Sequence, residues 1–419
     1  MNDYHWYKAN LGIEQIQLSA GLDENLVVAD NNNIYRYFPV QAKNPRWRGI
    51  LDFINSDVFA IFQDNGWVPR HTFQKHIAGY DVYAIEKCWP LIRAGTTAGT
   101  WNGSGGGPHG TRWDEMIPEQ ILAILCLGCE INAALIDNQS RMLLTDIRPC
   151  DFSLRKGIPI LLDTGAFDDI QERKDKILHS IIDTVAYYDC ASITAYLRNI
   201  TQPRSAKEWL QISEKIRSVQ PAPQQAGVWA QYGVHTESTE VKFIRQEIAN
   251  IKPKTVLDFC GNNGSFSSKV APSAHIICID NCKSALSDGY RSGYKSIDFA
   301  NIDITRKCED APYDAHLMAS WVQRFRCEVL LASSILHHML HMHMSLESIA
   351  KLFDKLAEKY MLVEFIKHTD PFTTTWYGPE QNFERLQRAL PGWVVINQFT
   401  GYEPGPSKDH RTWYTMKRV

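Results

Sequence analysis

The sequence has no excess of charge, no long apolar run and no recognisable leader segment. Its 44 basic residues are balanced by 47 acidic residues, for a net charge of -3. This balance gives no electrostatic reason to expect duplex nucleic acid or an anionic membrane as a partner. An apolar run such as Ile121–Leu127 is far shorter than the roughly 18–20 residues of a membrane span. The first residues do not resemble a signal peptide, so the cytoplasm is the expected location.

The ten cysteines are scattered along the chain instead of forming a dense framework, which predicts reduced thiols. Cys126 and Cys129 form a Cys-x-x-Cys pair inside an apolar helical stretch, with no second pair at zinc spacing. Core packing is therefore preferred to metal or redox chemistry for this pair. The glycine-rich run 103–110 lacks the Gly-Lys-Ser/Thr of a phosphate-binding loop and is interpreted as a surface loop.

A chain of 419 residues exceeds what one hydrophobic core usually organises, so two or three domains are expected. Residues 218–227 are rich in proline and glutamine and predict a semi-extended linker. The predicted organisation is an α+β accessory domain over residues 1–217, the linker 218–227 and an α/β domain over residues 228–419.

The most informative stretch is residues 254–267, where a short apolar strand ends in an acid and a glycine-punctuated turn. The strand ends at Asp258, and Gly261 and Gly264 permit a tight turn and the close approach of a ligand to the backbone. The third glycine of the dinucleotide fingerprint is missing, which disfavours a pyrophosphate. A ligand that carries an amine and a carboxylate fits better.

Polar residues also stand at the ends of the next predicted strands. Ile276–Ile279 is followed by Asp280, about 20 residues beyond the first acid, where a carboxylate can bind ribose hydroxyls. Asp303 ends a third strand, Ser333 follows a fourth, and Glu364 lies near the end of a fifth. Each acid alone could be a turn or helix-cap residue. Three acids in this order favour one cofactor site.

Residues 228–419 resemble the class I S-adenosylmethionine-dependent methyltransferases, and more narrowly a bacterial group related to the nodulation-protein methyltransferases. The resemblance rests on the turn 262–264, the segment Ser333–His338 and the strand Val363–Ile366. The turn reads Cys-Gly-Asn-Asn-Gly where the family usually has Cys-Asn-Thr-Gly or Gly-x-Gly. The resemblance implies a Rossmann-like, seven-stranded sheet that ends in a partly antiparallel hairpin, an N-terminal half upstream, and S-adenosyl-L-methionine as cofactor.

The resemblance also implies roles for the predicted site residues. The Gly261 and Gly264 backbone would surround the methionine moiety, Asp258 would orient its amine, Asp280 would bind the ribose, and Asp303 would lie near the adenine amine. The expected cofactor-binding residues are Asp258, Gly261, Asn262, Asn263, Gly264, Phe266, Asp280, Asp303 and Ser333.

The expected catalytic residues are His337, His338 and Glu364. In the resembled fold a histidine just beyond strand four faces the methyl group, and its near-neutral pKa suits it to take a proton. One of the two histidines is expected to face the substrate and the other to pack. Glu364 is either a second polar group at the reaction centre or a residue that orients a loop or a histidine. His341 and His343 extend the cluster, but no matching carboxylate accompanies them, so no metal is predicted.

The methyl acceptor is narrowed only by exclusion. The Asp/Asn-Pro-Pro-Tyr/Phe signature of amino-methylating DNA and RNA enzymes is missing after strand four, and so is the Pro-Cys nucleophile of cytosine-carbon methylases. A hydroxyl of a small molecule or glycan is the leading acceptor, and an amine on a small molecule or protein is the next. The aromatic segment 376–383 either stacks on a ring or packs as a lid. A non-catalytic scaffold that binds the cofactor, a bifunctional enzyme with phosphotransfer upstream, and homo-oligomerisation stay open.

Upstream of the linker, short β-like runs precede two helical stretches, 117–136 and 175–197. Between these helices lies a loop with Asp146 and Asp151, and then a strand that ends at Asp163 in Asp-x-Gly. This order resembles the catalytic loop and metal-binding strand of protein-kinase-like folds. Asp151 stands where those kinases have asparagine, and no convincing strand lysine is found. The N-terminal half is therefore interpreted as a degenerate kinase-like or otherwise accessory domain.

Overall fold

The protein is described from a computed structural model of the 419-residue chain. The described residues are 17–20, 26–29, 33–39, 45–77, 80–86, 115–144, 147, 152–155, 157–161, 167–169, 181, 191–200, 202–219, 238–304, 321–371, 373, 375–401 and 410–419.

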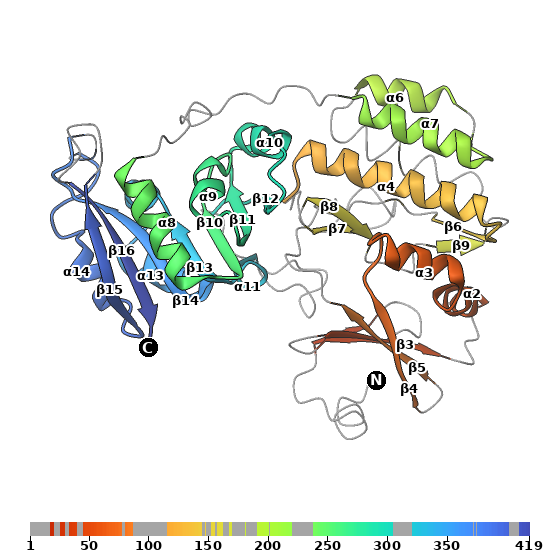
Figure 1. Cartoon of the computed structure of the whole chain (residues 1–419), viewed down its shortest axis with the longest axis horizontal. Helices are drawn as coiled ribbons and strands as arrows, with labels where there is room; N and C mark the ends of the chain where they lie inside the picture. The colour runs from red at the N-terminus through yellow and green to blue at the C-terminus, as the bar shows by residue number, and fades with distance from the viewer. Residues whose placement is uncertain are drawn as a thin grey trace. The chain divides into compact units, whose positions relative to one another are not determined.

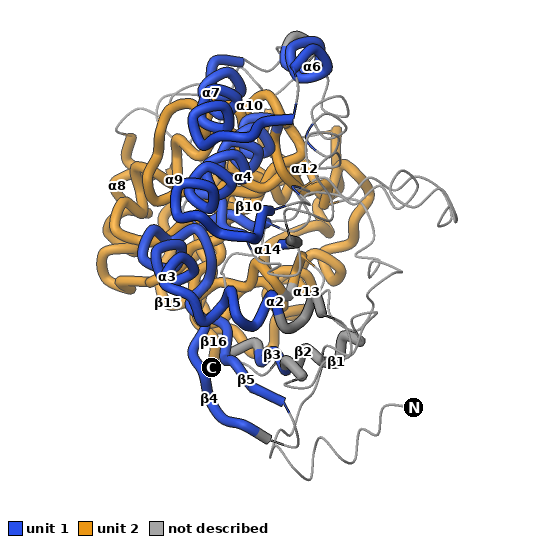
Figure 2. Tube along the Cα trace, turned by 90° about the vertical axis from the view of Figure 1, so that its right-hand side faces the viewer, with its two compact units in different colours: residues 1–113, 118–222, 309–319 blue, residues 114–117, 223–308, 320–419 orange. Residues whose placement is uncertain are grey.

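The chain forms two compact units, which Figure 2 distinguishes by colour. Unit 1 comprises residues 1–113, 118–222 and 309–319, and unit 2 comprises residues 114–117, 223–308 and 320–419. Most of the predicted linker 218–227 lies outside the described residues. The predicted domain bounds stay a prediction.

Unit 2 contains a seven-stranded sheet, visible in Figure 1, in the order β12-β11-β10-β13-β14-β16-β15. The first five strands of this order are parallel, whereas β16 runs antiparallel to both of its neighbours. The Rossmann-like sheet and its antiparallel hairpin are therefore as predicted. The strands are β10 (Thr255–Phe259), β11 (His275–Asp280), β12 (Ile297–Asn301), β13 (Cys327–Ala332), β14 (Ala357–Ile366), β15 (Trp393–Thr400) and β16 (Arg411–Arg418).

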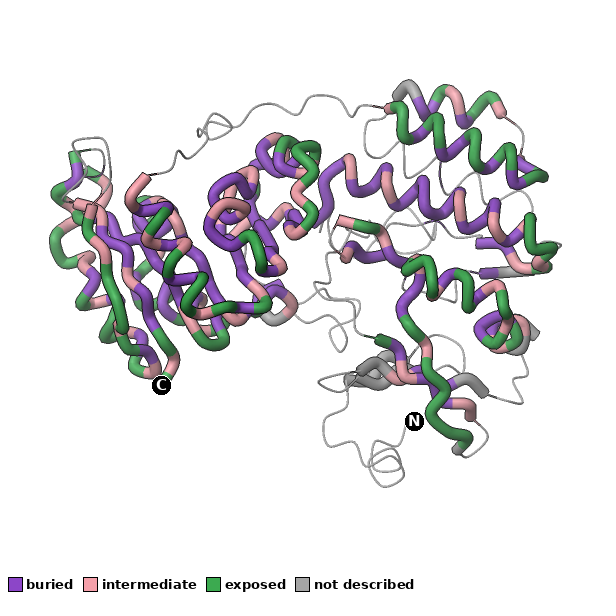
Figure 3. Tube along the Cα trace, in the orientation of Figure 1, coloured by how far each residue is buried: buried purple, intermediate pink, exposed green. Residues whose placement is uncertain are grey.

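The continuous apolar runs of the central strands are explained by burial on both faces of the sheet. Val256 and Leu257 of β10 and Ile276 and Ile277 of β11 are all fully buried, as is usual for parallel strands covered by helices. Figure 3 shows the same strands as buried along most of their length. The helices are α8 (Thr239–Ile251), α9 (Ser265–Val270), α10 (Lys283–Arg291), α11 (Trp321–Arg324), α12 (Leu336–His341), α13 (Leu346–Leu356) and α14 (Phe383–Arg388).

Unit 1 is an α+β unit, as predicted for the N-terminal region. A five-stranded sheet has the order β1-β2-β3-β5-β4, and its pairings are antiparallel. Two further pairs, β6 with β9 and β7 with β8, are also antiparallel. The elements are β1 (Gln17–Ala20), β2 (Leu26–Ala29), β3 (Asn33–Pro39), α2 (Pro45–Ile54), α3 (Asp57–Asp64), β4 (His71–Ile77), β5 (Tyr80–Glu86), α4 (Pro118–Asp137), β6 (Met142–Leu144), β7 (Phe152–Arg155), β8 (Ile158–Leu161), β9 (Phe167–Asp169), α6 (Ala191–Arg198) and α7 (Ala206–Arg217).

The residues that carried the kinase-like interpretation are not described. Asp146, Asp151 and Asp163, together with the glycine-rich run 103–110, lie outside the described residues. The interpretation of the N-terminal half as a degenerate kinase-like domain therefore stays a prediction.

Helix α4 is, among the described residues, the one helix long and apolar enough to cross a membrane by length and composition alone. Within its apolar window, 72% of the helix is buried inside the structure, a property shared by core helices of soluble proteins. Cys126 and Cys129 both lie in this buried helix. Burial raises the pKa of the Cys126 thiol to about 11, which agrees with a packing role.

Candidate functional site

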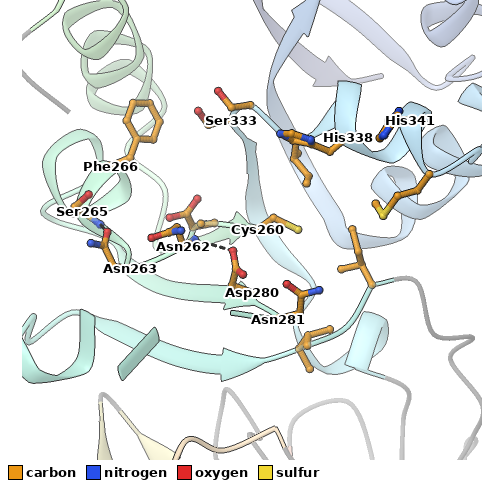
Figure 4. A pocket seen from close by; sticks show the side chains of 17 residues that line it. Cys260, Asn262, Asn263, Ser265, Phe266, Asp280, Asn281, Ser333, His338 and His341 are labelled. Carbon is orange, nitrogen blue, oxygen red and sulfur yellow. Dashed lines mark hydrogen bonds between the residues drawn. The ribbon is translucent and has the colours of Figure 1, made fainter. Parts of the chain in front are cut away.

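A cavity of about 350 Å³ opens at the carboxyl ends of β10, β11 and β13. Its volume lies within the range of ordinary small-molecule sites, and Figure 4 shows the side chains that face it. Ligands of open α/β sheets bind at this edge, because the strand ends leave a crevice there. The lining residues are Asp258, Cys260, Gly261, Asn262, Asn263, Ser265, Phe266, Asp280, Asn281, Ile302, Ile304, Ser333, Ser334, Ile335, His338, His341 and Met342.

The turn after β10 depends on its two glycines. A Cβ atom on Gly261 would lie 2.2 Å from Oδ2 of Asp258, a separation that no side chain tolerates. Gly264 has φ +70° and precedes the first residue of α9, so it occupies the left-handed region that glycine adopts without strain. Cys260 and Asn262 also have positive φ values, both 57°. This tightly wound backbone leaves room for a ligand against the strand end.

Asp258 places a buried carboxylate against the cavity. The residue is only 1% exposed, and its Oδ2 has no hydrogen-bond partner among the described residues. Burial, with a smaller contribution from the charge of Asp280, raises the pKa of Asp258 to about 7. Hydrogen bonding from Ser267 and Cys278 opposes this rise, but a buried carboxylate oxygen without a partner stays costly unless a cation or a hydrogen-bond donor joins it. The site is therefore suited to a positively charged group of a ligand.

Asp280 connects two segments of the cavity wall. Its Oδ2 accepts a hydrogen bond from the Asn262 backbone N–H at 2.9 Å, drawn dashed in Figure 4, and its Oδ1 accepts from the Cys282 N–H at 2.8 Å. Burial raises its pKa, and these two backbone donors oppose the rise. Each carboxylate oxygen has two lone pairs, so each can accept a further hydrogen bond from a ligand hydroxyl.

The remaining predicted cofactor residues divide into two groups. Gly261, Asn262, Asn263, Phe266 and Ser333 line the cavity beside the two acids. Phe266 also stacks on Trp413, with the ring centroids 6.0 Å apart. Two predicted residues, Gly264 and Asp303, are not among the lining residues, although Ile302 and Ile304 on either side of Asp303 are.

Glu364 holds the loop that follows β13. Its Oε2 accepts hydrogen bonds from Ser334 N at 2.7 Å and from Ser334 Oγ at 2.8 Å. Ser334 has φ +49°, an unfavourable conformation that these two bonds stabilise. Arg411 Nη1 lies 3.4 Å from Oε1 of the same carboxylate. Glu364 is 2% exposed and does not line the cavity, so the observed contacts are those of a loop-orienting residue.

The two predicted histidines have different environments. His338 is half-buried and lines the cavity, whereas His337 is buried and does not line it. The two imidazole centroids are 4.0 Å apart, and both rings contact Trp376, at 5.6 Å from His337 and 5.2 Å from His338. Burial, with smaller contributions from the adjacent histidine of the cluster and from Arg411, lowers the pKa of His337 to about 2 and that of His338 to about 4. Both imidazoles are therefore neutral near pH 7.

The structure adds residues to the site that the sequence reasoning did not assign to it. His341, which lies one turn after His338, lines the cavity and stacks on Trp376 with a centroid separation of 4.6 Å. The three-residue spacing between His338 and His341 on α12 could have indicated that His341 belongs to the site. No local pattern could have indicated Arg411, because the pairing of β14 with β16 brings it to Glu364.

Within the described part of the chain, no group of three or more His, Cys, Asp or Glu side chains could hold a metal ion.

Comparison with known proteins gives remote similarities of fold. No protein-family model matches the chain, and no curated protein sequence matches it. The N-methyltransferase NodS from Bradyrhizobium japonicum WM9 is similar at 12% identity and a TM-score of 0.33, over 43% of this chain and 93% of that chain. Magnesium protoporphyrin IX methyltransferase (ChlM) from Synechocystis PCC 6803, with bound S-adenosylmethionine, is similar at 12% identity and a TM-score of 0.31, over 43% of this chain and 78% of that chain.

A third similar structure is the bifunctional kinase-methyltransferase WbdD, at 13% identity and a TM-score of 0.32, over 47% of this chain and 43% of that chain. The match thus spans less than half of WbdD. These similar structures are S-adenosylmethionine-dependent methyltransferases. At such identities and TM-scores, function has to be decided from the residues of the site.

Proposed function

We propose that the chain is an S-adenosylmethionine-dependent methyltransferase. The observation that carries this proposal is a single cavity at the carboxyl edge of the sheet, with two buried carboxylates at one end and a neutral histidine at the other. S-adenosylmethionine carries an ammonium group, ribose hydroxyls and a methyl group on a sulfonium. In this proposal the Asp258 carboxylate binds the ammonium group, the Asp280 carboxylate binds the ribose hydroxyls, and His338 lies at the end of the cavity that receives the methyl group.

The acidic end fits the polar groups of the cofactor. Asp258, whose Oδ2 has no partner among the described residues, would take the ammonium group, and Asp280 would take the ribose hydroxyls. The glycine-containing turn would bring backbone groups to the methionine moiety. When bound, the cofactor supplies an electrophilic methyl group. Positioning the acceptor and removing its proton remain the tasks of the protein.

At the other end of the cavity, His338 is the proposed proton acceptor. It lines the cavity and is neutral near pH 7, so its ring nitrogen can take the proton from the hydroxyl group that is to be methylated. His337 would pack behind it, and Glu364 would act through Ser334. Among the described lining residues no lysine or arginine stands at this end, which supports an uncharged acceptor. We therefore favour O-methylation of a small-molecule or glycan hydroxyl.

A second candidate is N-methylation of an amine on a small molecule or protein. The low pKa of His338, about 4, supports this alternative, because an unprotonated amine attacks without help from a strong base whereas a hydroxyl needs one.

Cytoplasmic location, and the lack of duplex nucleic acid and membrane among the partners, stay predictions.

Two measurements test the proposal. Calorimetry with S-adenosylhomocysteine should give saturable binding that is weakened in the Asp280→Ala variant. Transfer of labelled methyl groups from S-adenosylmethionine should then be measured with parallel sets of hydroxyl and amine acceptors. Binding without transfer to any acceptor, including an extract of the source organism, would favour the scaffold alternative. Absence of binding by the folded protein would refute the proposed function.

A further inference from the structure

Residues Glu115–Ile117 are part of the cofactor-binding unit, although they precede its first strand by a long stretch of sequence. The Glu115 carbonyl accepts a hydrogen bond from Asn301 N–H at 2.8 Å, at the end of β12. Met116 and Ile117 are fully buried, and Ile117 belongs to the hydrophobic core that contains β10 and β11 residues. We call Glu115–Ile117 the upstream strap.

A buried ion pair holds the upstream strap. Arg324 Nη1 donates to Glu115 Oε2 at 2.9 Å, and Nη2 donates to Oε1, so the guanidinium binds the carboxylate through two nitrogens. The two residues are 209 positions apart in the sequence, and their side chains are only 8% and 10% exposed. A bidentate pair fixes direction as well as distance, and removal of one partner leaves the other charge buried.

The upstream strap is joined to the cavity wall through two adjoining residues. Asn301, which is bonded to Glu115, is followed by Ile302, whose N–H donates to the Asp280 carbonyl at 2.7 Å. Ile302 and Ile304 line the cavity, as does Asp280. A short chain of backbone hydrogen bonds therefore connects Glu115 to the residue proposed to bind the ribose.

We propose that Glu115 and Arg324 are positioning residues for the adenosine half of the cofactor site, through the upstream strap and the end of β12. This inference rests on the proposed function. Neither Glu115 nor Arg324 lines the cavity. The ion pair determines where Asn301 and the two lining isoleucines lie, and hence the width of the cavity beside Asp280. Loss of the pair weakens binding of every ligand that carries adenosine, by a factor that does not depend on the methionine moiety.

The test uses the full chain and three variants, Glu115→Ala, Glu115→Gln and Arg324→Met. The probes are S-adenosylhomocysteine and adenosine, each titrated by calorimetry. Glu115→Ala and Arg324→Met should weaken both probes by the same factor, at least about fivefold, the lower end of typical coupling between sites. Glu115→Gln, which keeps the shape and one acceptor oxygen, should lose less. If Glu115→Ala does not fold, Arg324→Met and Glu115→Gln still decide the matter.

The matched control is Glu328→Gln. Glu328 makes an ion pair with Lys359 at 2.7 Å and lies near the start of β13, away from the cavity-forming strand end. This variant should keep the wild-type affinity for both probes, even if its melting temperature falls. Wild-type affinity in Glu115→Ala and Arg324→Met would overturn the inference and reduce the upstream strap to a stabilising contact. A wild-type protein that binds neither probe would instead refute the proposed function.

Discussion

The buried carboxylate of Asp258 should make the affinity for the proposed cofactor depend on pH in a defined direction. Burial raises its pKa to about 7, so in the free protein about half of the molecules carry a protonated Asp258 at pH 7. An ammonium group beside it favours the ionised form and lowers the pKa in the complex. Binding below pH 7 must therefore release a proton, and the affinity should rise as the pH rises.

The size of this effect follows from the two pKa values. If the bound pKa returns to the ordinary value of 3.8, protonation of the free protein weakens binding about 100-fold at pH 5 and about twofold at pH 7. The affinity for S-adenosylhomocysteine should thus increase about 50-fold between pH 5 and pH 7. The Asp258→Asn variant, which cannot ionise, should lose this dependence.

Calorimetry at several pH values between 5 and 7 measures the effect, and adenosine is the matched control ligand. Adenosine lacks the ammonium group but shares the contacts proposed for Asp280, whose pKa is also raised by burial. The ratio of the affinity for S-adenosylhomocysteine to the affinity for adenosine therefore reports the effect of Asp258 ionisation alone. Repeating the titrations in buffers of different ionisation enthalpy counts the protons released. A ratio that stays constant over this range would refute the assignment of Asp258 to the amine.

Three further predictions concern single residues. Asp280→Ala should weaken S-adenosylhomocysteine by roughly 1.5–3 kcal/mol, the contribution of charge-assisted hydrogen bonds, and calorimetry showing unchanged affinity in the folded variant would contradict the ribose role. His338→Gln should slow single-turnover methyl transfer by roughly 10²–10⁴-fold with little change in cofactor affinity. His337→Gln should lower mainly the melting temperature, and equal transfer rates in the two variants would argue against His338 as the base. Glu364→Gln should lower the free energy of unfolding by roughly 1–3 kcal/mol, because it weakens the hydrogen bonds to Ser334. A loss of methyl-transfer rate as large as that of His338→Gln would instead indicate that Glu364 acts at the reaction centre.

Much of the sheet could be predicted from local sequence, because parallel strands buried on both faces require continuous apolar runs. The apolar runs before Asp258 and Asp280 form β10 and β11, as predicted. The helix before the first strand also follows from local sequence, since Val241, Ile244 and Ile248 recur at helical spacing and are all buried in α8.

Local patterns could not separate the roles of neighbouring residues in the site. His337 and His338 are adjacent in sequence and of the same type, but the direction in which α12 packs puts only His338 against the cavity. The sequence also gave no reason to prefer either interpretation of Glu364, as a polar group at the reaction centre or as a residue that orients a loop or a histidine. Its contacts with Ser334 depend on how β14 lies beside β13, which no local pattern contains.

By itself, then, the sequence determined where β10 and β11 end, the acids at those two strand ends and the glycine turn after β10, because these features depend on residues within a few positions of one another. The predicted third strand was placed wrongly, since β12 ends at Asn301, two residues before Asp303. The tertiary structure alone decided the contacts across the chain. Arg411 meets Glu364 only when β16 inserts beside β14, and Glu115 meets Arg324 across 209 residues. Such contacts form because burial brings distant charges into a low-dielectric interior where each requires a partner, and sequence spacing holds no record of which partner that is.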